Sequence, residues 1–287
     1  MSKTYPIGQP IFCAGCGHFG VQRAIQHALR EAQIPLHETL VLAGIGCSGT
    51  LQNNIGAYGY HSMHGRVLPT AIGSSLANPD LTIIATGGDG DGYAIGGGHL
   101  MHGLKRNANL VYVIMNNGVY GLTKGQDSPT KEDPLAAPEE EPLDAMMLGL
   151  SINNSSFLAR AITTRSDQLN GLILRGLEHA REGKGMAFIE VLSPCVTYHD
   201  TYPEWMNRVH DVDTDPAYDR YNRGQAFARL FDLTQQSRIP IGLIFHAEHA
   251  SLQSAMLGEV TPFHALDAVR TAQSREYMDT ILAGYAI

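Results

Sequence analysis

The sequence predicts an α/β fold in which a mostly parallel sheet is flanked by helices. Two strongly apolar segments, Leu81–Thr86 and Leu110–Met115, have the length and composition of buried strands. A glycine-rich turn and a helical pattern over Ala94–Arg106 lie between them. Together they form a βαβ unit of about 35 residues, the usual size for such a unit. Because crossovers of this kind join parallel strands, we expect a parallel sheet.

Further segments show the same patterns of buried strands and amphipathic helices. Apolar residues recur at helical spacing over Phe19–Ala32, and Thr39–Gly44 has the character of a buried strand that ends in a glycine-rich turn. Val67–Asn78 is predicted to be a helix, because Pro69 lies in its first turn and another proline follows its end. The later predicted elements are a helix over Ser166–Arg181 and a strand over Met186–Leu192.

Composition excludes several classes of protein. The 287 residues are 44% hydrophobic and 17% charged, which rules out a disordered or fibrous chain. The net charge of −8 argues against non-specific binding of nucleic acid. The first ten residues lack the apolar core of a signal peptide, and the uncharged stretch Thr39–Gly65 is too polar for a membrane span. We therefore expect a cytoplasmic protein that binds neither membrane nor nucleic acid.

The predicted elements concentrate in the first part of the chain. We predict one domain over residues 1–200 and a C-terminal extension over 201–287. The acidic, proline-rich segment Lys131–Pro142 is predicted to be an extended surface loop. In the extension, the apolar stretch Ile239–Phe245 and the helical pattern of Pro262–Arg270 argue against disorder.

One group of candidate functional residues follows two neighbouring strands. The turn Gly88-Asp89-Gly90 comes directly after Leu81–Thr86, and the next strand ends at Asn116-Asn117. Glycines allow a phosphate to approach the backbone, whereas a carboxylate at the same turn would repel it unless Mg²⁺ lay between them. A surface turn whose aspartate caps a helix is the simpler alternative. Because both halves lie at strand ends, where open α/β sheets bind ligands, a diphosphate and metal site is favoured.

The four cysteines form a second group. They allow a disulfide framework, a thioredoxin-like pair, or one four-cysteine site for zinc or a [4Fe–4S] cluster. Two of the four each follow a predicted strand and would lie at the edge of the sheet that carries Asp89, which favours the single four-cysteine site. The cysteines are Cys13, Cys16, Cys47 and Cys195.

These motifs together resemble the β subunits of 2-oxoacid:ferredoxin oxidoreductases, which have a thiamine diphosphate-binding fold. The resemblance covers about residues 10–200 and is strongest to the short, separate β chains of the 2-oxoglutarate and broad 2-oxoacid enzymes. One departure is Ala14, where the family often has proline. The motifs occur in a fixed order: Phe12-Cys13-Ala14-Gly15-Cys16-Gly17, Gly44-Ile45-Gly46-Cys47-Ser48, His61-Ser62-Met63-His64-Gly65-Arg66, Gly88-Asp89-Gly90-Asp91, Asn116-Asn117-Gly118-Val119-Tyr120 and Leu122-Thr123-Lys124-Gly125-Gln126.

The resemblance assigns roles to particular residues. It implies that all four cysteines bind a [4Fe–4S] cluster, and that Asp89, the side chain of Asn117 and the main-chain carbonyl of Val119 hold Mg²⁺. The implied contacts to thiamine diphosphate are Gly46, Cys47, Ser48, His64, Gly88, Asp89, Gly90, Asn117, Val119, Gly121 and Leu122.

Three more side chains are candidates for roles in substrate or cofactor binding. Lys124 is the leading candidate cation for a substrate carboxylate, with a solvated surface lysine as the alternative. Arg66 is a weaker candidate for the same role, and a structural ion pair explains it slightly better. His61 and His64 have a spacing that also suits metal ligands, but the motif favours a contact from His64 to the diphosphate.

The implied activity is the CoA-dependent oxidative decarboxylation of 2-oxoglutarate to succinyl-CoA, or the reverse carboxylation, with electrons passed to ferredoxin. Thiamine diphosphate serves as the electron sink and the cluster carries single electrons. The resemblance also implies a separate α subunit, in an (αβ)₂ heterotetramer, that completes the cofactor site. Pyruvate or branched-chain 2-oxoacids remain alternative substrates. A non-redox thiamine diphosphate enzyme subunit and a zinc-binding scaffold remain alternative functions.

Overall fold

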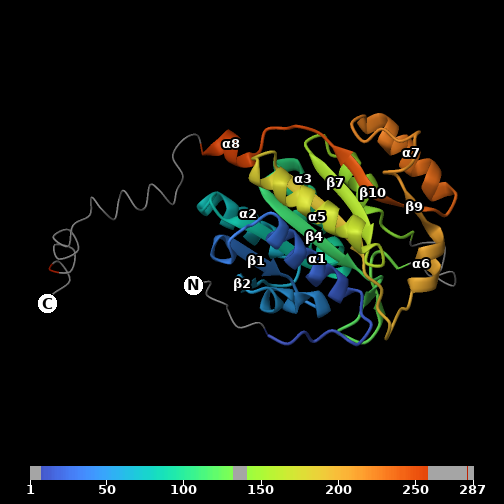
Figure 1. Ribbon diagram of the computed structural model, residues 1–287, viewed down its shortest axis with the longest axis horizontal. Helices are drawn as coiled ribbons and strands as arrows, with labels where there is room; N and C mark the ends of the chain where they lie inside the picture. Colours follow the sequence, from blue (N-terminus) through green and yellow to red (C-terminus); the bar gives the residue numbers. More distant parts are fainter. Residues whose placement is uncertain (1–7, 132–140, 258–282, 284–287) are drawn as a thin grey trace.

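The computed structural model describes residues 8–131, 141–257 and 283, and within these ranges eight strands form one sheet (Figure 1). The strand order is β2-β1-β3-β4-β8-β7-β10-β9, and every neighbouring pair is parallel except β10 with β7. The strands are β1 (Thr39–Ala43), β2 (Tyr58–His61), β3 (Thr82–Gly88), β4 (Leu110–Asn116), β7 (Phe157–Ile162), β8 (Met186–Leu192), β9 (Val209–Asp211) and β10 (Ile239–His246). A separate antiparallel pair is formed by β5 (Val119–Tyr120) and β6 (Gln126–Asp127).

Helices cover both faces of the sheet. On one face α1 and α5 lie side by side (Figure 1), and on the other α2, α3, α4 and α7 contribute to the core. Strand β4 shows why its sequence is apolar throughout: Tyr112 faces one core while Val111 and Val113 face the other. The helices are α1 (His18–Glu31), α2 (Val67–Ala77), α3 (Gly97–Arg106), α4 (Ala145–Leu150), α5 (Ser166–Arg181), α6 (Tyr202–Arg208), α7 (Arg223–Gln235) and α8 (Leu252–Met256).

The predicted α/β architecture is confirmed. Strands β3 and β4 pair in parallel across α3, as expected for the βαβ unit, and β1 and β8 match the other two predicted strands. The prediction that the helix after the glycine turn begins at Ala94 is wrong by three residues. Residues Gly90–Ile95 form a π-helical turn instead, in which the Gly96 amide donates to the Asp91 carbonyl at 3.1 Å. Such turns are frequent at functional sites.

Several strands were not predicted from the sequence, among them β2 and β7 of the main sheet. Strand β2 lies at the edge of the sheet with all four residues exposed, so it carries no apolar signal. Strand β7 is fully buried but contains Arg160, whose charge interrupts the apolar pattern. Both depend on contacts with distant segments rather than on local sequence.

The part of the chain after residue 200 contributes to the same sheet. The apolar stretch Ile239–Phe245 lies within β10, which pairs with β7, and α7 packs against β10. The boundary at residue 200 stays a prediction. Most of the predicted loop Lys131–Pro142 and all of Pro262–Arg270 lie outside the described residues. Within the described ranges, no helix is long and apolar enough to cross a membrane.

A buried histidine makes stability depend on pH. Burial, with smaller contributions from the charges of His246 and Lys184, lowers the pKa of His179 from 6.5 to about 4. Its Nε2 lies 2.9 Å from the Ser156 hydroxyl, and its Nδ1 has no hydrogen-bond partner among the described residues. The folded chain therefore holds a neutral imidazole that becomes charged on unfolding whenever the pH lies below 6.5.

We expect this histidine to contribute to acid destabilisation. As the pH falls from 6.5 towards about 4, each unit costs about 1.4 kcal/mol of the free energy of unfolding. The variant His179→Gln should have a shallower slope in this window, whatever its stability at pH 8. Urea unfolding followed at several pH values would measure both slopes, and equal slopes would contradict this assignment.

Candidate functional site

The carboxyl ends of four parallel strands meet at one edge of the sheet. The registers place Ala43 of β1 beside Thr86, Gly88 of β3 beside Met115, and Asn116 of β4 beside Leu192 of β8. The chain segments that leave β1, β3, β4 and β8 therefore begin side by side. This is the position at which open α/β sheets bind ligands.

A cavity of about 200 Å³ lies at this edge, lined by the loops that follow the strands. All eleven residues predicted to contact the cofactor line it, although they come from four separate segments of the sequence. His18, Ile45, Asp91, Tyr120 and Thr123 complete the lining.

Asp89 is the buried acid of this cavity. Its side chain is 1% exposed, and its Oδ2 accepts hydrogen bonds from the hydroxyls of Ser128 and, at 2.7 Å, Thr130. Burial raises the pKa of Asp89, because these hydroxyls and the amides of Asp89 and Asn117 only partly offset the loss of water. No cationic side chain pairs with it among the described residues. A divalent cation fits here, since it would offset the desolvation of the carboxylate.

The Asn117 turn lies across the cavity from the glycine turn. Asn117 Oδ1 accepts the Val119 amide at 3.1 Å, and Gly118 between them has a φ of +68°. Both Asn117 and Val119 line the cavity with Asp89, so the three predicted metal ligands lie in one place. The structure thus brings together oxygen donors of the kind that Mg²⁺ prefers.

The glycines leave room for a ligand. Gly46 has a φ of +110°, and a Cβ added to it would meet nothing within 4 Å, so its open side faces the cavity. At Gly90 an added Cβ would overlap the Tyr120 ring, so packing within the protein requires this glycine. The open backbone at Gly46 is one that a phosphate could approach closely.

Asp91 holds two of the loops in place. Its Oδ1 accepts the amides of Ile45 at 3.0 Å and Gly65 at 2.8 Å, and lies 2.8 Å from His64 Nδ1. This contact leaves His64 Nε2 free to act in the cavity. Asp91 was not among the predicted site residues. Its place in the Gly88-Asp89-Gly90-Asp91 motif was the available signal.

The four cysteine thiols lie close to one another and to the cavity. A Cβ on Gly121 would lie 3.4 Å from Cys47 Sγ and 3.8 Å from Cys195 Sγ. Burial and the nearby Cys195, Cys47 and Cys13 raise the pKa of Cys16 from 9.0 to about 11, against a lowering by the His18 amide. A raised pKa argues against a reactive thioredoxin-like pair. All four are free thiols, and in the described part of the chain no three ligands converge on a single metal ion.

His18 connects the cysteines to the cavity and was missed from the sequence. Its ring is 1% exposed and lines the cavity, and its Nδ1 lies 2.6 Å from the hydroxyl of Ser193, two residues before Cys195. Burial lowers its pKa from 6.5 to about 4, so the imidazole is neutral at pH 7. Its position directly after Cys16-Gly17 was the available signal.

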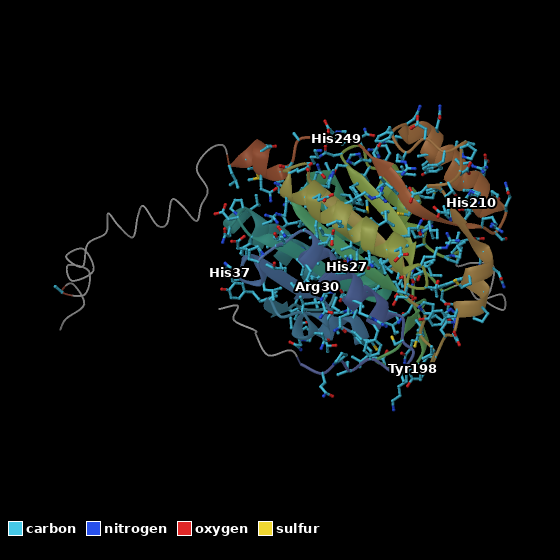
Figure 2. All side chains as sticks on the ribbon, viewed as in Figure 1. His27, Arg30, His37, Tyr198, His210 and His249 are labelled. Carbon is cyan, nitrogen blue, oxygen red and sulfur yellow. The ribbon has the colours of Figure 1, made fainter. Side chains whose placement is uncertain are left out.

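The two candidate cations lie outside this lining. Lys124 is exposed and has a φ of +78°. The adjoining Gly125 packs near Tyr198, which projects from the surface in Figure 2. Arg66 is also exposed and donates to the Ile95 carbonyl at 3.3 Å. Neither reaches the cavity in this structure.

Fold and site define a thiamine diphosphate enzyme. Residues 44–191 match the family model of the thiamine pyrophosphate enzyme C-terminal TPP-binding domain. Residues 195–260 match the family model of the C-terminal region of the pyruvate ferredoxin oxidoreductase beta subunit.

Comparisons with individual proteins, which extend over most of the chain, indicate a more specific family than the two family models do. The chain is 36% identical to the 2-oxoacid:ferredoxin oxidoreductase subunit beta of Saccharolobus solfataricus, over 88% of this chain and 86% of that one. It is 37% identical to the 2-oxoglutarate synthase subunit KorB of Methanothermobacter thermautotrophicus, over 66% of each chain. The chain therefore belongs to the β subunits of 2-oxoacid:ferredoxin oxidoreductases.

The chain is also similar to a solved structure of an enzyme of this kind. The 2-oxoglutarate:ferredoxin oxidoreductase of Magnetococcus marinus, with 2-oxoglutarate, coenzyme A and succinyl-CoA bound, is similar with a TM-score of 0.80 and 29% identity. The match covers 100% of this chain and 97% of that one.

The open backbone at Gly46 gives a testable prediction. Gly46→Ala should lower the free energy of unfolding by about 1–2 kcal/mol because of its positive φ, and should weaken thiamine diphosphate binding because the new methyl group enters the cavity. Gly73→Ala is the matched control, since a Cβ there also meets nothing within 4 Å but lies in α2. Urea unfolding and binding calorimetry would measure both. An unchanged affinity for the cofactor would contradict the placement.

Proposed function

We propose that this chain is the catalytic β subunit of a 2-oxoglutarate:ferredoxin oxidoreductase. The reaction converts 2-oxoglutarate, CoA and two oxidised ferredoxins into succinyl-CoA, CO₂, two reduced ferredoxins and a proton, or runs in reverse. One observation carries the proposal: the cavity that holds Asp89 and the glycine turn also contains Cys47, whose thiol lies beside those of the other cysteines. A cofactor site and a cysteine cluster side by side suit chemistry that transfers electrons between them.

The cavity residues fit thiamine diphosphate. Bound there, the cofactor supplies a carbanion and an electron sink for decarboxylation. The backbones of Gly46, Gly88 and Gly90 would approach its diphosphate, while Asp89, Asn117 and the Val119 carbonyl would hold Mg²⁺. The remaining proposed contacts are Cys47, Ser48, His64, Gly121 and Leu122.

The four thiols fit a [4Fe–4S] cluster better than a zinc ion. Zinc needs four ligands around one atom, whereas a cubane binds each thiolate through a different iron, so its ligands stand apart. The thiols of Cys13, Cys16, Cys47 and Cys195 are close enough to influence one another's pKa, and those of Cys47 and Cys195 both lie near Gly121 at the cavity. This grouping of four thiols beside the cofactor cavity supports the cluster and, with it, single-electron transfer to ferredoxin.

Two observations support 2-oxoglutarate as the substrate: the names of the relatives and the positive charge of Lys124. The KorB relatives are named for 2-oxoglutarate, and the similar solved structure has 2-oxoglutarate and coenzyme A bound. We assign the second carboxylate of the substrate to Lys124 and a cofactor or substrate contact to His64. Pyruvate and branched-chain 2-oxoacids lack that second carboxylate, so Lys124 distinguishes them.

A separate α subunit would cover the cavity. Relatives are named as β subunits, and exposed apolar side chains lie on the loops near the cavity: Ile45 lines it, Met63 adjoins His64 and Ile95 lies beside Gly65, with exposures of 36%, 76% and 50%. Apolar surface of this kind next to a binding site is typical of a subunit interface. We infer an (αβ)₂ assembly in the cytoplasm, with ferredoxin as the redox partner.

The function is tested with and without the partner. The anaerobic complex should reduce ferredoxin only when 2-oxoglutarate and CoA are both present, and this chain alone should give no turnover. Ferredoxin reduction is followed by absorbance and succinyl-CoA by chromatography. Turnover by the isolated chain, or decarboxylation by the complex without reduction of any acceptor, would refute the proposal.

Lys124 gives a prediction about selectivity. Lys124→Ala should raise the KM for 2-oxoglutarate about tenfold, through loss of a charge-assisted contact, and leave the KM for pyruvate nearly unchanged. Lys105→Ala, an exposed lysine in the last turn of α3, is the control and should change neither. Steady-state kinetics of the three complexes give the comparison. Equal changes for both substrates would remove Lys124 from substrate recognition.

A further inference from the structure

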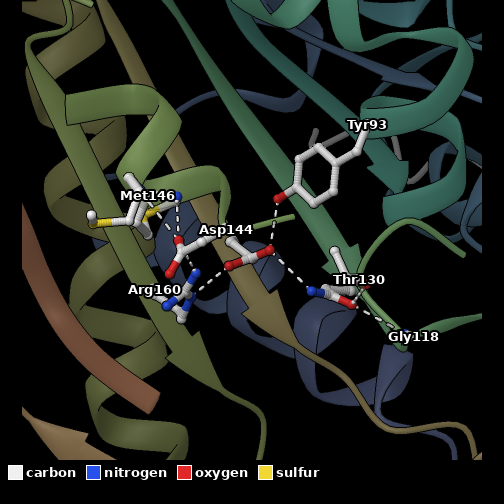
Figure 3. A network of polar contacts seen from close by, with 9 residues as sticks. Tyr93, Gly118, Thr130, Asp144, Met146 and Arg160 are labelled. Carbon is white, nitrogen blue, oxygen red and sulfur yellow. Dashed lines mark hydrogen bonds and ion pairs between the residues drawn. The ribbon is translucent and has the colours of Figure 1, made fainter. Parts of the chain in front are cut away.

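A chain of polar contacts leads from Asp89 through Thr130 into the sheet, and Figure 3 shows its part from Thr130 to Arg160. The Thr130 hydroxyl lies 2.7 Å from Asp89 Oδ2 and 2.8 Å from Asn116 Oδ1. Asn116 Nδ2 in turn donates to Glu190 Oε1 at 3.0 Å. Glu190 belongs to β8, is 1% exposed, and does not line the cavity.

Glu190 is held firmly by groups from three other elements. Tyr93 donates its hydroxyl to Oε1 at 2.8 Å, and Arg160 of β7 donates Nε to Oε2 at 2.5 Å. Arg160 also donates to Asp144 at 2.7 Å. Burial and the charge of Glu190 raise the pKa of Tyr93, so this hydroxyl remains a donor. Both carboxylate oxygens of Glu190 are therefore fixed in place.

This arrangement determines the orientation of the Asn116 amide. A carboxylate only accepts hydrogen bonds, so the amide nitrogen of Asn116 must face Glu190. Its oxygen then faces Thr130, where it also accepts the Gly118 amide at 3.1 Å. Without Glu190 only the Gly118 amide would hold this orientation, and an amide that turned over would present a donor to Thr130 instead.

The orientation matters because the Thr130 hydroxyl has one hydrogen and two close acceptors, Asp89 and Asn116, with the Ser128 hydroxyl farther away at 3.5 Å. When a cation binds Asp89, the carboxylate oxygen has less capacity to accept from Thr130. The hydroxyl can then donate to Asn116, provided that the amide oxygen faces it. A flipped amide would leave this hydroxyl without its second acceptor and would favour the bond that competes with the metal.

We propose that Glu190 is a positioning residue for the cation site at Asp89, acting through Asn116 and Thr130. The inference rests on the proposed function, because it presumes that thiamine diphosphate binds with a divalent cation. Glu190 would otherwise be explained as one half of a buried ion pair with Arg160. The proposal gives it a role in cofactor binding as well. Partners of metal ligands in other proteins have comparable effects on metal affinity.

The test is the Mg²⁺ dependence of thiamine diphosphate binding by the complex with its partner subunit, measured by calorimetry. Glu190→Gln keeps the shape of the side chain but replaces one carboxylate oxygen by an amide nitrogen, which is a hydrogen-bond donor. This donor would face either Arg160 or the groups of Tyr93 and Asn116, which are donors themselves. We expect the Mg²⁺ concentration for half-maximal binding to rise about tenfold or more. Asp213→Asn is the control, because Asp213 is also part-buried and paired, with Arg220, but does not line the cavity. It should lower Tm and leave the Mg²⁺ dependence within about twofold of the wild type.

A second variant covers the case in which Glu190→Gln fails to assemble. Tyr93→Phe removes one donor to Glu190 and keeps the ion pair, and should shift the Mg²⁺ dependence about threefold in the same direction. An unshifted Mg²⁺ dependence in Glu190→Gln would overturn the proposal. If Glu190→Gln does not assemble, an unshifted Mg²⁺ dependence in Tyr93→Phe would overturn it instead. An equal shift in Asp213→Asn would also overturn it. If the wild-type complex binds no thiamine diphosphate with Mg²⁺, the proposed function itself fails instead.

Discussion

Parallel pairing of β1, β3, β4 and β8 is the constraint on which the site depends. Helices cover both faces of this part of the sheet, so its strands are apolar almost throughout and polar groups gather at the strand ends. Because the strands run in the same direction and in register, those ends share one edge. Cys47, Asp89, Asn117 and Cys195 are far apart in sequence but follow these four strands, and they meet for that reason. The glycine turn, the asparagine turn and the cysteines are thus consequences of one topology.

Two buried carboxylates near this edge have different partners. Glu190 is neutralised by Arg160, which also pairs with Asp144. Burial acts to raise the pKa of Asp144, but the charge and hydrogen bond of Arg160 and the amides of Met147 and Met146 together outweigh it, and the pKa is lowered. Asp89 has hydroxyl and amide donors, and its pKa is raised by burial. The fold therefore leaves a negative charge uncompensated at Asp89, beside the cavity, where a cation can bind, and compensates the one deeper in the sheet.

Much of this site could be predicted from the sequence, because strand ends and glycine turns leave local signals. The turn around Asp89 and the asparagine pair lie where apolar runs stop, and all eleven proposed cofactor contacts line one cavity. Glu190 and Arg160 could not be found this way. Each is a single charge inside an apolar strand, and their pairing exists only once β7 and β8 align Arg160 with Glu190. His18 and Asp91 were likewise missed because their roles depend on contacts with Ser193 and with the loops after β1 and β2.

We propose that a cofactor cavity and an iron–sulfur cluster lie side by side in this chain. The most direct measurement is iron, acid-labile sulfide and zinc per chain in anaerobically purified protein, alongside the electron paramagnetic resonance spectrum of the reduced form. We expect about four iron and about four sulfide per chain, no stoichiometric zinc, and the signal of a reduced [4Fe–4S] cluster. Stoichiometric zinc without sulfide would contradict it, because the four cysteines would then form a structural site that cannot carry electrons.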